Sequence, residues 1–292
     1  MQNKTMDSEE KWDLVVKPQV SVFDLNLKEV WRYRDLLILF VKRDIVAVYK
    51  QTILGPIWFV LQPLLQTIVF NFVFSSSFSR SINGCPYFLF TFCGIACWNY
   101  FAECLTNTSN TFIANSSIFG KVYFPRLISP LAIVTSSVIK FLIQFVFFIV
   151  MLIYFIVIGR VGMEISWSVF LVPLLVILMA MLGLSIGITI SSLTTKYRDL
   201  RFLIAFGVQL FMFVSPVLRP VTPEAVNAKK HFIEMLNPMA SILEAFKFIF
   251  LGNGTGTLSW PWLLYSTGFA FLTFFLAVII FNKVEKSFMD TV

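Results

Sequence analysis

Six apolar segments with very few charged residues recur along this chain of 292 residues. Most of them are about 18 to 25 residues long, the length that an α-helix needs to cross the hydrocarbon core of a bilayer. They are Ile57–Phe74, Phe88–Leu105, Leu127–Ile158, Val169–Ser192, Phe202–Leu218 and Trp262–Phe281. The sequence therefore predicts an all-α integral membrane protein with about six transmembrane helices.

The composition leads to the same class. Hydrophobic residues make up 58% of the chain and charged residues only 13%, and 34 residues are Phe. The mean hydropathy is +0.81. A single core of ordinary size could not bury this much apolar surface, so we expect lipid to cover part of it.

A charged segment, residues 27–54, precedes the first apolar segment. Apolar residues in it recur three and four positions apart, as on one side of a helix: Leu37, Ile38, Val41, Ile45, Val48 and Tyr49. Charged residues fall mostly on the other side: Lys28, Arg32, Asp35, Lys42, Arg43 and Lys50. We expect an amphipathic helix at the membrane surface, with its basic groups near water and lipid phosphate. Pro56 then begins the first span, because proline cannot continue a helix but fits its first turn.

The remaining parts divide around this pattern. Residues 1–26 are polar and lack the charged start and apolar run of a signal peptide, so we expect a cytosolic tail. Residues 55–292 form the transmembrane domain. Within an extracytoplasmic region, residues 219–260, the apolar run Ile242–Leu251 is too short to cross a bilayer. We expect it to form a short re-entrant or interfacial helix before the last span.

The distribution of basic residues predicts the orientation. With both termini on the cytosolic side, that side carries 16 of the 23 Lys and Arg residues. Cytoplasmic loops of membrane proteins are enriched in Lys and Arg, so we expect both termini in the cytoplasm. The net charge of +7 follows from this bias, and no basic stripe outside the membrane flanks indicates a nucleic-acid partner.

Two internal cytosolic loops, residues 115–126 and 194–201, combine basic and aromatic residues. One interpretation is that their charges only hold the loops on the cytosolic side. The other is that they form a docking surface for a cytosolic partner, since aromatic residues and Arg are enriched at binding hot spots. The candidate docking residues are Phe119, Lys121, Tyr123, Arg126, Tyr197, Arg198 and Asp199.

The chain shows no energy source of its own. It has no GxxxxGK[ST] phosphate-binding loop, and Gly120-Lys121 is followed by Val. The spans also lack the chain of carboxylates expected of a proton pump. Glu103 and Lys140 are the one acid and the one base evident inside the spans, on adjacent antiparallel segments, so we expect a structural ion pair rather than a proton relay.

Several motifs, in one order from Leu27 to the end of the chain, resemble the permease subunit of type-2 ABC exporters. The resemblance is to the branch that exports O-antigen, capsule or teichoic-acid polysaccharide. It depends on RDLLILFVKRDI (34–45), YKQTILGPIWFVLQP (49–63), FGKVYFPR (119–126), TTKYRDLR (194–201), SPV (215–217), LNPMASILEAFKFIFLG (236–252) and FNKVEKSFMD (281–290). Together the motifs are specific, whereas any one alone is weak.

This resemblance implies a multi-pass protein of a bacterial inner membrane that is not an enzyme and binds no cofactor. Two permease copies would work with two copies of a cytosolic ATP-binding subunit, which holds ATP and Mg. The loops 115–126 and 194–201 would meet that subunit. Residues 34–50 would be the interface helix at a gate, and 238–251 the re-entrant region at the outer mouth. The cargo would be a lipid-linked polysaccharide.

Two sets of side chains are candidates for contact with such a cargo. Aromatic rings stack on the apolar faces of sugars. Because the first and fifth spans line the channel in this family, the channel candidates are Trp58, Phe59, Phe206, Phe211 and Phe213. Contact with lipid or with other helices accounts equally for aromatic residues in spans. The candidates for the lipid pyrophosphate at the gate are Arg34, Lys42 and Arg43, for which lipid-headgroup contact is an equal alternative.

The same features also fit an ABC exporter of another lipid or of a drug-like cargo. A membrane-embedded enzyme acting on lipid-linked sugars should show clustered acids or a metal site. Cys93 and Cys97 lie one helical turn apart but have no His or acid placed to complete a metal site. A secondary transporter should show internal repeats with interrupted helices at the midplane.

Overall fold

The structure of the chain is a computed structural model. It describes residues 27–50, 52–74, 81–82, 84–115, 118, 124–161, 167–194, 199–252 and 254–288. Its helices, with two short 3₁₀ segments (η), are α1 (Leu27–Arg32), α2 (Arg34–Tyr49), η1 (Gly55–Ile57), α3 (Trp58–Phe74), α4 (Tyr87–Ser109), α5 (Thr111–Ala114), α7 (Ile128–Val157), η2 (Trp167–Leu171), α8 (Val172–Thr194), α9 (Leu200–Val214), α10 (Ala228–Met235), α11 (Pro238–Leu251) and α12 (Trp260–Phe288).

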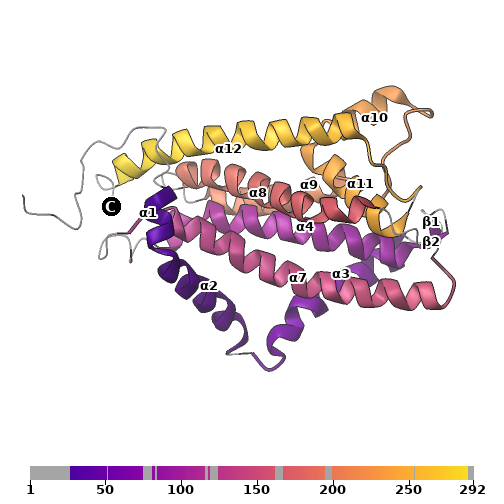
Figure 1. Cartoon of the computed structure of the whole chain (residues 1–292), viewed down its shortest axis with the longest axis horizontal. Helices are drawn as coiled ribbons and strands as arrows, with labels where there is room; N and C mark the ends of the chain where they lie inside the picture. Colours follow the sequence, from indigo (N-terminus) through magenta and orange to yellow (C-terminus); the bar gives the residue numbers. More distant parts are fainter. Residues whose placement is uncertain are drawn as a thin grey trace, which may run out of the picture.

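The long helices α4, α7, α8 and α12 run side by side along the longest axis of the molecule (Figure 1). Helix α1 and the end of α12 lie at one end of this bundle, called the terminal end below. Helix α10 and a two-stranded antiparallel hairpin, β1 (Ser81–Ile82) and β2 (Cys85–Pro86), lie at the opposite end, called the far end. The prediction of an all-α integral membrane protein is confirmed.

Helix α4 is the centre of the bundle. Of its 23 residues, 17 are buried, and it packs against α3, α7, α8, α9 and α11. Its tightest neighbour is α8, where two glycines allow the helix backbones to approach closely. A Cβ atom on Gly183 would lie 2.7 Å from Cys104 Cβ, and one on Gly187 would lie 2.7 Å from Thr108 Cβ. Small residues of this kind are typical of helix contacts within membranes.

Within the described residues, five helical segments have the length and apolar character of a membrane span: Gly55–Phe74, Tyr87–Ser109, Ile128–Val157, Trp167–Ser192 and Trp260–Lys283. The sixth predicted span is shorter than expected. Helix α9 has 15 residues and ends at Val214, not at Leu218, so it rises about 22 Å. Ser215 is extended, with φ −77° and ψ 153°, because the residue before a proline avoids the helical region.

The charged residues named in the prediction are all exposed: Lys28 and Arg32 of α1, Asp35, Lys42 and Arg43 of α2, and Lys50 directly after it. The apolar side of α2 differs from the prediction. Phe40 and Val41 are buried in a cluster with Phe124 and Ile128 at the start of α7, whereas Ile38 is 60% exposed. The apolar stripe therefore packs in part on the protein itself. Beyond this cluster, α2 leaves the bundle and α3 returns to it, so that the two helices form a V with Gly55 and Pro56 between them (Figure 1).

Candidate functional site

The five channel candidates lie on α3 and α9, two helices that contact each other at the edge of the bundle. The ring centroids of Phe70 and Phe213 are 6.0 Å apart, and Gln66 Nε2 lies 3.8 Å from Met212 Sδ. Within these fully described helices, the buried residues are Pro63 and Thr67 of α3 and Met212 of α9. Most of the surface of both helices is therefore free of contact within one copy of the chain.

The structure brings most of the candidate aromatics to this open surface. Phe206 is 62% exposed, Phe213 47% and Trp58 42%. Phe211 is 37% exposed, and its ring centroid lies 5.7 Å from that of Trp98 on α4. Phe59 is half-buried, beside the Lys140 ammonium. Whether these rings line a channel stays a prediction.

The three gate candidates all lie on the exposed side of α2, and two have an acidic neighbour in sequence. The Arg34 guanidinium lies 3.9 Å from the Asp35 carboxylate, and Arg43 lies 2.8 Å from Asp44 Oδ1. Lys42 is exposed between them. These exposed pairs are weak in water. The three cations can therefore still attract a phosphate, and their role as a gate stays a prediction.

Five of the seven docking candidates, Phe119, Lys121, Tyr123, Tyr197 and Arg198, lie outside the described residues. The other two flank the loops at the terminal end. Arg126 is 8% exposed in the turn before α7, and Asp199 is exposed at the first turn of α9. The ends of α4 and α8 meet here, where Thr194 Oγ1 donates a hydrogen bond of 2.8 Å to the Ser109 carbonyl. The docking function stays a prediction.

Glu103 on α4 and Lys140 on α7 form an ion pair in the structure. The carboxylate side chain is 28% exposed and the lysine side chain 14%. The Lys140 ammonium also lies 5.7 Å from the centre of the Phe59 ring. The pair thus joins α4 to α7 beside the start of α3. No chain of further acids leads away from it among the described residues.

Glu103 and Lys140 are not the only charged side chains inside the bundle, contrary to the sequence-based expectation. Glu244 and Lys247 of α11 are 1% and 0% exposed. The Lys247 ammonium donates to the carbonyls of Pro216 and Val217, the latter at 3.3 Å, and lies 3.7 Å from the centre of the Phe90 ring. Lys247 lies within the region 219–260 that was expected to be extracytoplasmic, so this role was not predicted. The signal available in the sequence was that Glu244 and Lys247 lie three residues apart within an apolar helix, where they can share one side.

The Lys247 contacts explain how α9 can end below the surface of the bundle. The turn after α9 packs so closely on α4 that a Cβ atom on Gly94 would lie 2.5 Å from the Val217 carbonyl oxygen. Non-helical backbone at membrane depth needs partners for its polar groups. Lys247 supplies them for two carbonyls, and Tyr87 Oη donates to the Leu218 carbonyl at 2.9 Å. This arrangement anchors α9 to α4 and α11.

A second polar network at the far end was also missed by sequence reasoning. Glu234 of α10 accepts hydrogen bonds from Arg219 Nη1 at 2.7 Å and from the Thr222 N–H at 2.8 Å. Burial acts to raise the pKa of the Glu234 carboxyl, but the bonds from Thr222 and Arg219 outweigh it, so this pKa is lowered. Asn227 caps α10 by accepting a hydrogen bond of 3.0 Å from the Lys230 N–H.

Neither network has the composition of a metal centre. All four cysteines are buried along α4 and its start, and each is a free thiol. Among the described residues, no group of three or more His, Cys, Asp or Glu side chains is placed to share an ion.

Comparisons with known proteins agree with this architecture. The model of the ABC-2 type transporter family matches residues 35–251. Two O-antigen export system permease proteins RfbA of Klebsiella pneumoniae are each 30% identical over 256 residues, which cover 88% of this chain and 94% of theirs. The RfbA permease of Myxococcus xanthus is 25% identical over 224 residues, covering 77% of this chain and 83% of its own. The chain therefore belongs to the ABC-2 type transporter family, as a multi-pass membrane permease.

Proposed function

We propose that this chain is the transmembrane subunit of an ATP-driven exporter of lipid-linked polysaccharide of the O-antigen type. The observation that carries the proposal is the similarity to O-antigen export permeases at 30% identity over 94% of their length. Because the match extends over nearly the whole of both chains, it includes the spans and the loops between them. The direction of transport is from the cytoplasm across a bacterial inner membrane, with both termini in the cytoplasm.

The exposed surface of α3 and α9 supports a path between two permease copies. Gln62 and Gln209 are exposed on these mostly apolar helices. Polar side chains within a membrane normally face a protein interior or a water-filled space, because an amide facing lipid loses its hydrogen bonds. Exposed aromatic rings beside them, Phe206 and Phe213, offer stacking surfaces for sugars. A second copy opposite this surface would enclose such a path.

The driving force comes from a cytosolic ATP-binding subunit, present in two copies. The chain contains no phosphate-binding loop of its own. The helices on either side of the loops 115–126 and 194–201 end or begin at the terminal end, near α1 and the end of α12 (Figure 1). A subunit bound there would contact both loops and α2 together. ATP and Mg belong to that subunit.

In this mechanism, ATP binding closes the two partner subunits and their motion passes through the two loops into α2 and α9. Because the first turns of α9 have no buried residue, they can move relative to α4 at a small cost in packing, while the C-terminal end of α9 stays anchored. The space between the permease copies opens for the lipid head and then for the sugar chain, and ATP hydrolysis resets it. Binding of the cargo and binding of ATP thereby favour the same open conformation of the helix bundle.

The test is complementation of a strain that lacks its O-antigen permease, with surface polysaccharide detected by antibody. Expressing this chain with its partner subunit should restore surface display. Lys121→Glu and Arg198→Glu should abolish display and uncouple ATP hydrolysis from export, while membrane insertion is unchanged. Arg160→Glu, an exposed cation after α7 at the far end, is the matched control. Full display in both loop variants would refute docking, and failure of the unaltered pair to display any polysaccharide would refute the cargo.

A further inference from the structure

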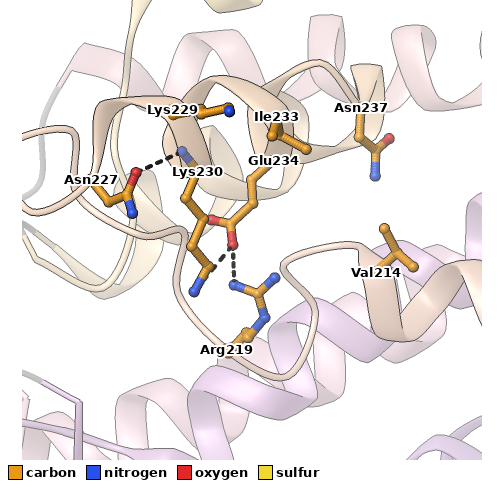
Figure 2. A pocket seen from close by; sticks show the side chains of 8 residues that line it. All are labelled: Val214, Arg219, Asn227, Lys229, Lys230, Ile233, Glu234 and Asn237. Atoms are coloured by element: carbon orange, nitrogen blue, oxygen red, sulfur yellow. Dashed lines mark hydrogen bonds and ion pairs between the residues drawn. The ribbon is translucent and has the colours of Figure 1, made fainter.

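A cavity of about 470 Å³ lies at the far end, between the last residue of α9 and helix α10 (Figure 2). Its wall carries three cations, Arg219, Lys229 and Lys230, and one carboxylate, Glu234. The formal charge of these side chains is +2 in total. Two amides and two aliphatic side chains complete the wall. The cavity surface is therefore mostly apolar, and the charged side chains around it give it a net positive charge.

The cations keep capacity for a further anion. Figure 2 shows Arg219 and Lys230 approaching the Glu234 carboxylate, but Arg219 uses only Nη1 for it, at 2.7 Å, and a guanidinium has five N–H donors. Lys230 Nζ stands 4.0 Å from Glu234 Oε1, beyond hydrogen-bond length. Glu234 thus holds two cations at one side of the cavity without saturating them. Lys229 adds an exposed ammonium from the same helix.

An exposed apolar track leads to this cavity along α9. Phe206, Leu210 and Val214 are spaced four residues apart, so they share one side of the helix, and they are 62%, 50% and 62% exposed. Their eight-residue separation corresponds to about 12 Å of helix. Val214 lines the cavity itself, and Ile233 of α10, also 62% exposed, lines it too. The apolar track on α9 and the positively charged cavity are thus continuous.

We propose that this cavity binds the phosphate or diphosphate headgroup of a membrane lipid whose hydrocarbon chain lies along α9. Phosphate oxygens accept strong, charge-assisted hydrogen bonds from Arg and Lys. The net charge of +2 suits a group with more than one negative charge, and the track buries apolar surface of the chain. The lipid comes either from the cargo, as a polyprenyl diphosphate, or from the bilayer, as an anionic phospholipid. The first source depends on the proposed function and the second does not.

The test uses the full chain in nanodiscs of phosphatidylcholine, with bound lipid counted by native mass spectrometry. The probes are a polyprenyl diphosphate, phosphatidylglycerol and inorganic pyrophosphate. The variant Lys229→Gln/Lys230→Gln removes two cations and leaves the bond between Arg219 and Glu234 in place. A cation near a membrane surface changes Kd by about fivefold, so the loss of two partly solvated cations should raise Kd for the lipid probe roughly ten- to thirtyfold.

The matched control is Arg160→Gln/Lys283→Gln, which removes the same charge from exposed positions outside the cavity. Its Kd should stay within about twofold of the unaltered chain. Equal binding by the cavity variant and the unaltered chain, or an equal loss in the control, would overturn the proposal. Inorganic pyrophosphate should bind more weakly than either lipid, because it cannot use the track. Equally tight binding of inorganic pyrophosphate would refute a lipid site.

The probes also identify the source. Preference for the polyprenyl diphosphate assigns the site to the cargo, and preference for phosphatidylglycerol assigns it to the bilayer. Either preference supports the site if the cavity variant loses it. Since binding is measured without ATP or transport, its failure leaves the export proposal intact. Failure of export in cells likewise leaves the lipid-binding result standing.

Discussion

Helices α4 and α3 are both long enough to cross a membrane, yet their surroundings in the protein are opposite. Of the residues in α4, 17 of 23 are buried, whereas two of 17 are buried in α3. Mean hydropathy alone would place α3 in the protein interior and α4 at its surface, since it is 1.3 for the α4 span and 1.7 for the α3 span. The more polar helix lies at the centre, where Tyr87 bonds to the Leu218 carbonyl and Glu103 pairs with Lys140, partners that lipid cannot offer.

Helix α9 resembles α3 in this respect. Met212 is its one buried residue, and Ile204 and Val208 pack against the core only in part. The two exposed helices carry the proposed path, and the buried helix carries the contacts that hold the bundle together. Substitutions should therefore affect folding near α4 and export on α3 and α9. Four predictions test this division, from the largest expected effect to the smallest.

The largest effect is expected at Lys247, where α11, α4 and the turn after α9 meet. Lys247→Met leaves the Pro216 and Val217 carbonyls without their donor and Glu244 without a nearby cation. Removing one partner from a buried charged network costs about 3–5 kcal/mol. Thermal unfolding in detergent, monitored by size-exclusion chromatography, should show a lower unfolding temperature for Lys247→Met. Lys229→Met, at an exposed position, is the control, and equal melting of the two variants would contradict the prediction.

Steric contact between α8 and α4 gives the second prediction. A Cβ atom on Gly187 would lie 2.9 Å from the Leu105 carbonyl oxygen, so Gly187→Leu must push the helices apart, at a cost of about 1–3 kcal/mol. The same change at Gly207 of α9 meets no atom within 4 Å. Gly207→Leu should fold as well as the unaltered chain or slightly better, given the low helix propensity of glycine. A similar loss of folded yield in Gly187→Leu and Gly207→Leu would contradict the difference between the tightly packed surface of α4 and the open surface of α9.

The ion pair between α4 and α7 should have a smaller effect. Glu103→Gln and Lys140→Met each remove one charge of a partly exposed pair, and polar contacts within membranes are worth about 1 kcal/mol. Each single variant should lower the folded yield, and the double variant should recover part of it. The measurement is a double-mutant cycle on folded yield. Strictly additive losses would mean that the two side chains do not stabilise each other.

The smallest effect is a pH dependence at the far end. Since the pKa of Glu234 is lowered on folding, its ionised form stabilises the protein fully above the ordinary pKa of about 4.3, and this contribution is lost as the pH falls through the lower, folded pKa. The difference in unfolding temperature between the unaltered chain and Glu234→Gln should therefore stay constant from pH 7 down to about pH 5 and shrink as the pH falls below about 4.3. Glu224→Gln, at an exposed position, is the control. A difference that stays constant as the pH falls below about 4 would refute the prediction.

Much of the fold followed from the pattern of residues. The positions of the apolar segments, the break at Gly55-Pro56 and the exposed charges of α2 all agree with the structure, because these features depend on local periodicity and on proline geometry. The short α9 was missed because an apolar run extends through Val214 and past Pro216. Hydropathy does not register where a helix ends inside an apolar run.

The candidate sites were predicted less completely. The sequence placed Phe206 and Phe213 on a span, but their exposure depends on which side of α9 packs on α4. The roles of Lys247 and Arg219 could not be foreseen, since their partners lie 30 or 31 and 15 residues away along the chain. Contacts of that separation arise only when the helices are assembled.

By itself, the sequence determined that this chain is a helical membrane protein with a charged helix before its first span, because hydropathy reports whether a residue prefers water. It could not decide which helix would be central, since a protein interior and a lipid tail are similarly apolar. That choice was made by tertiary packing, through the close contact of Gly183 and Gly187 with α4 and the bonds of Lys247 to the turn after α9.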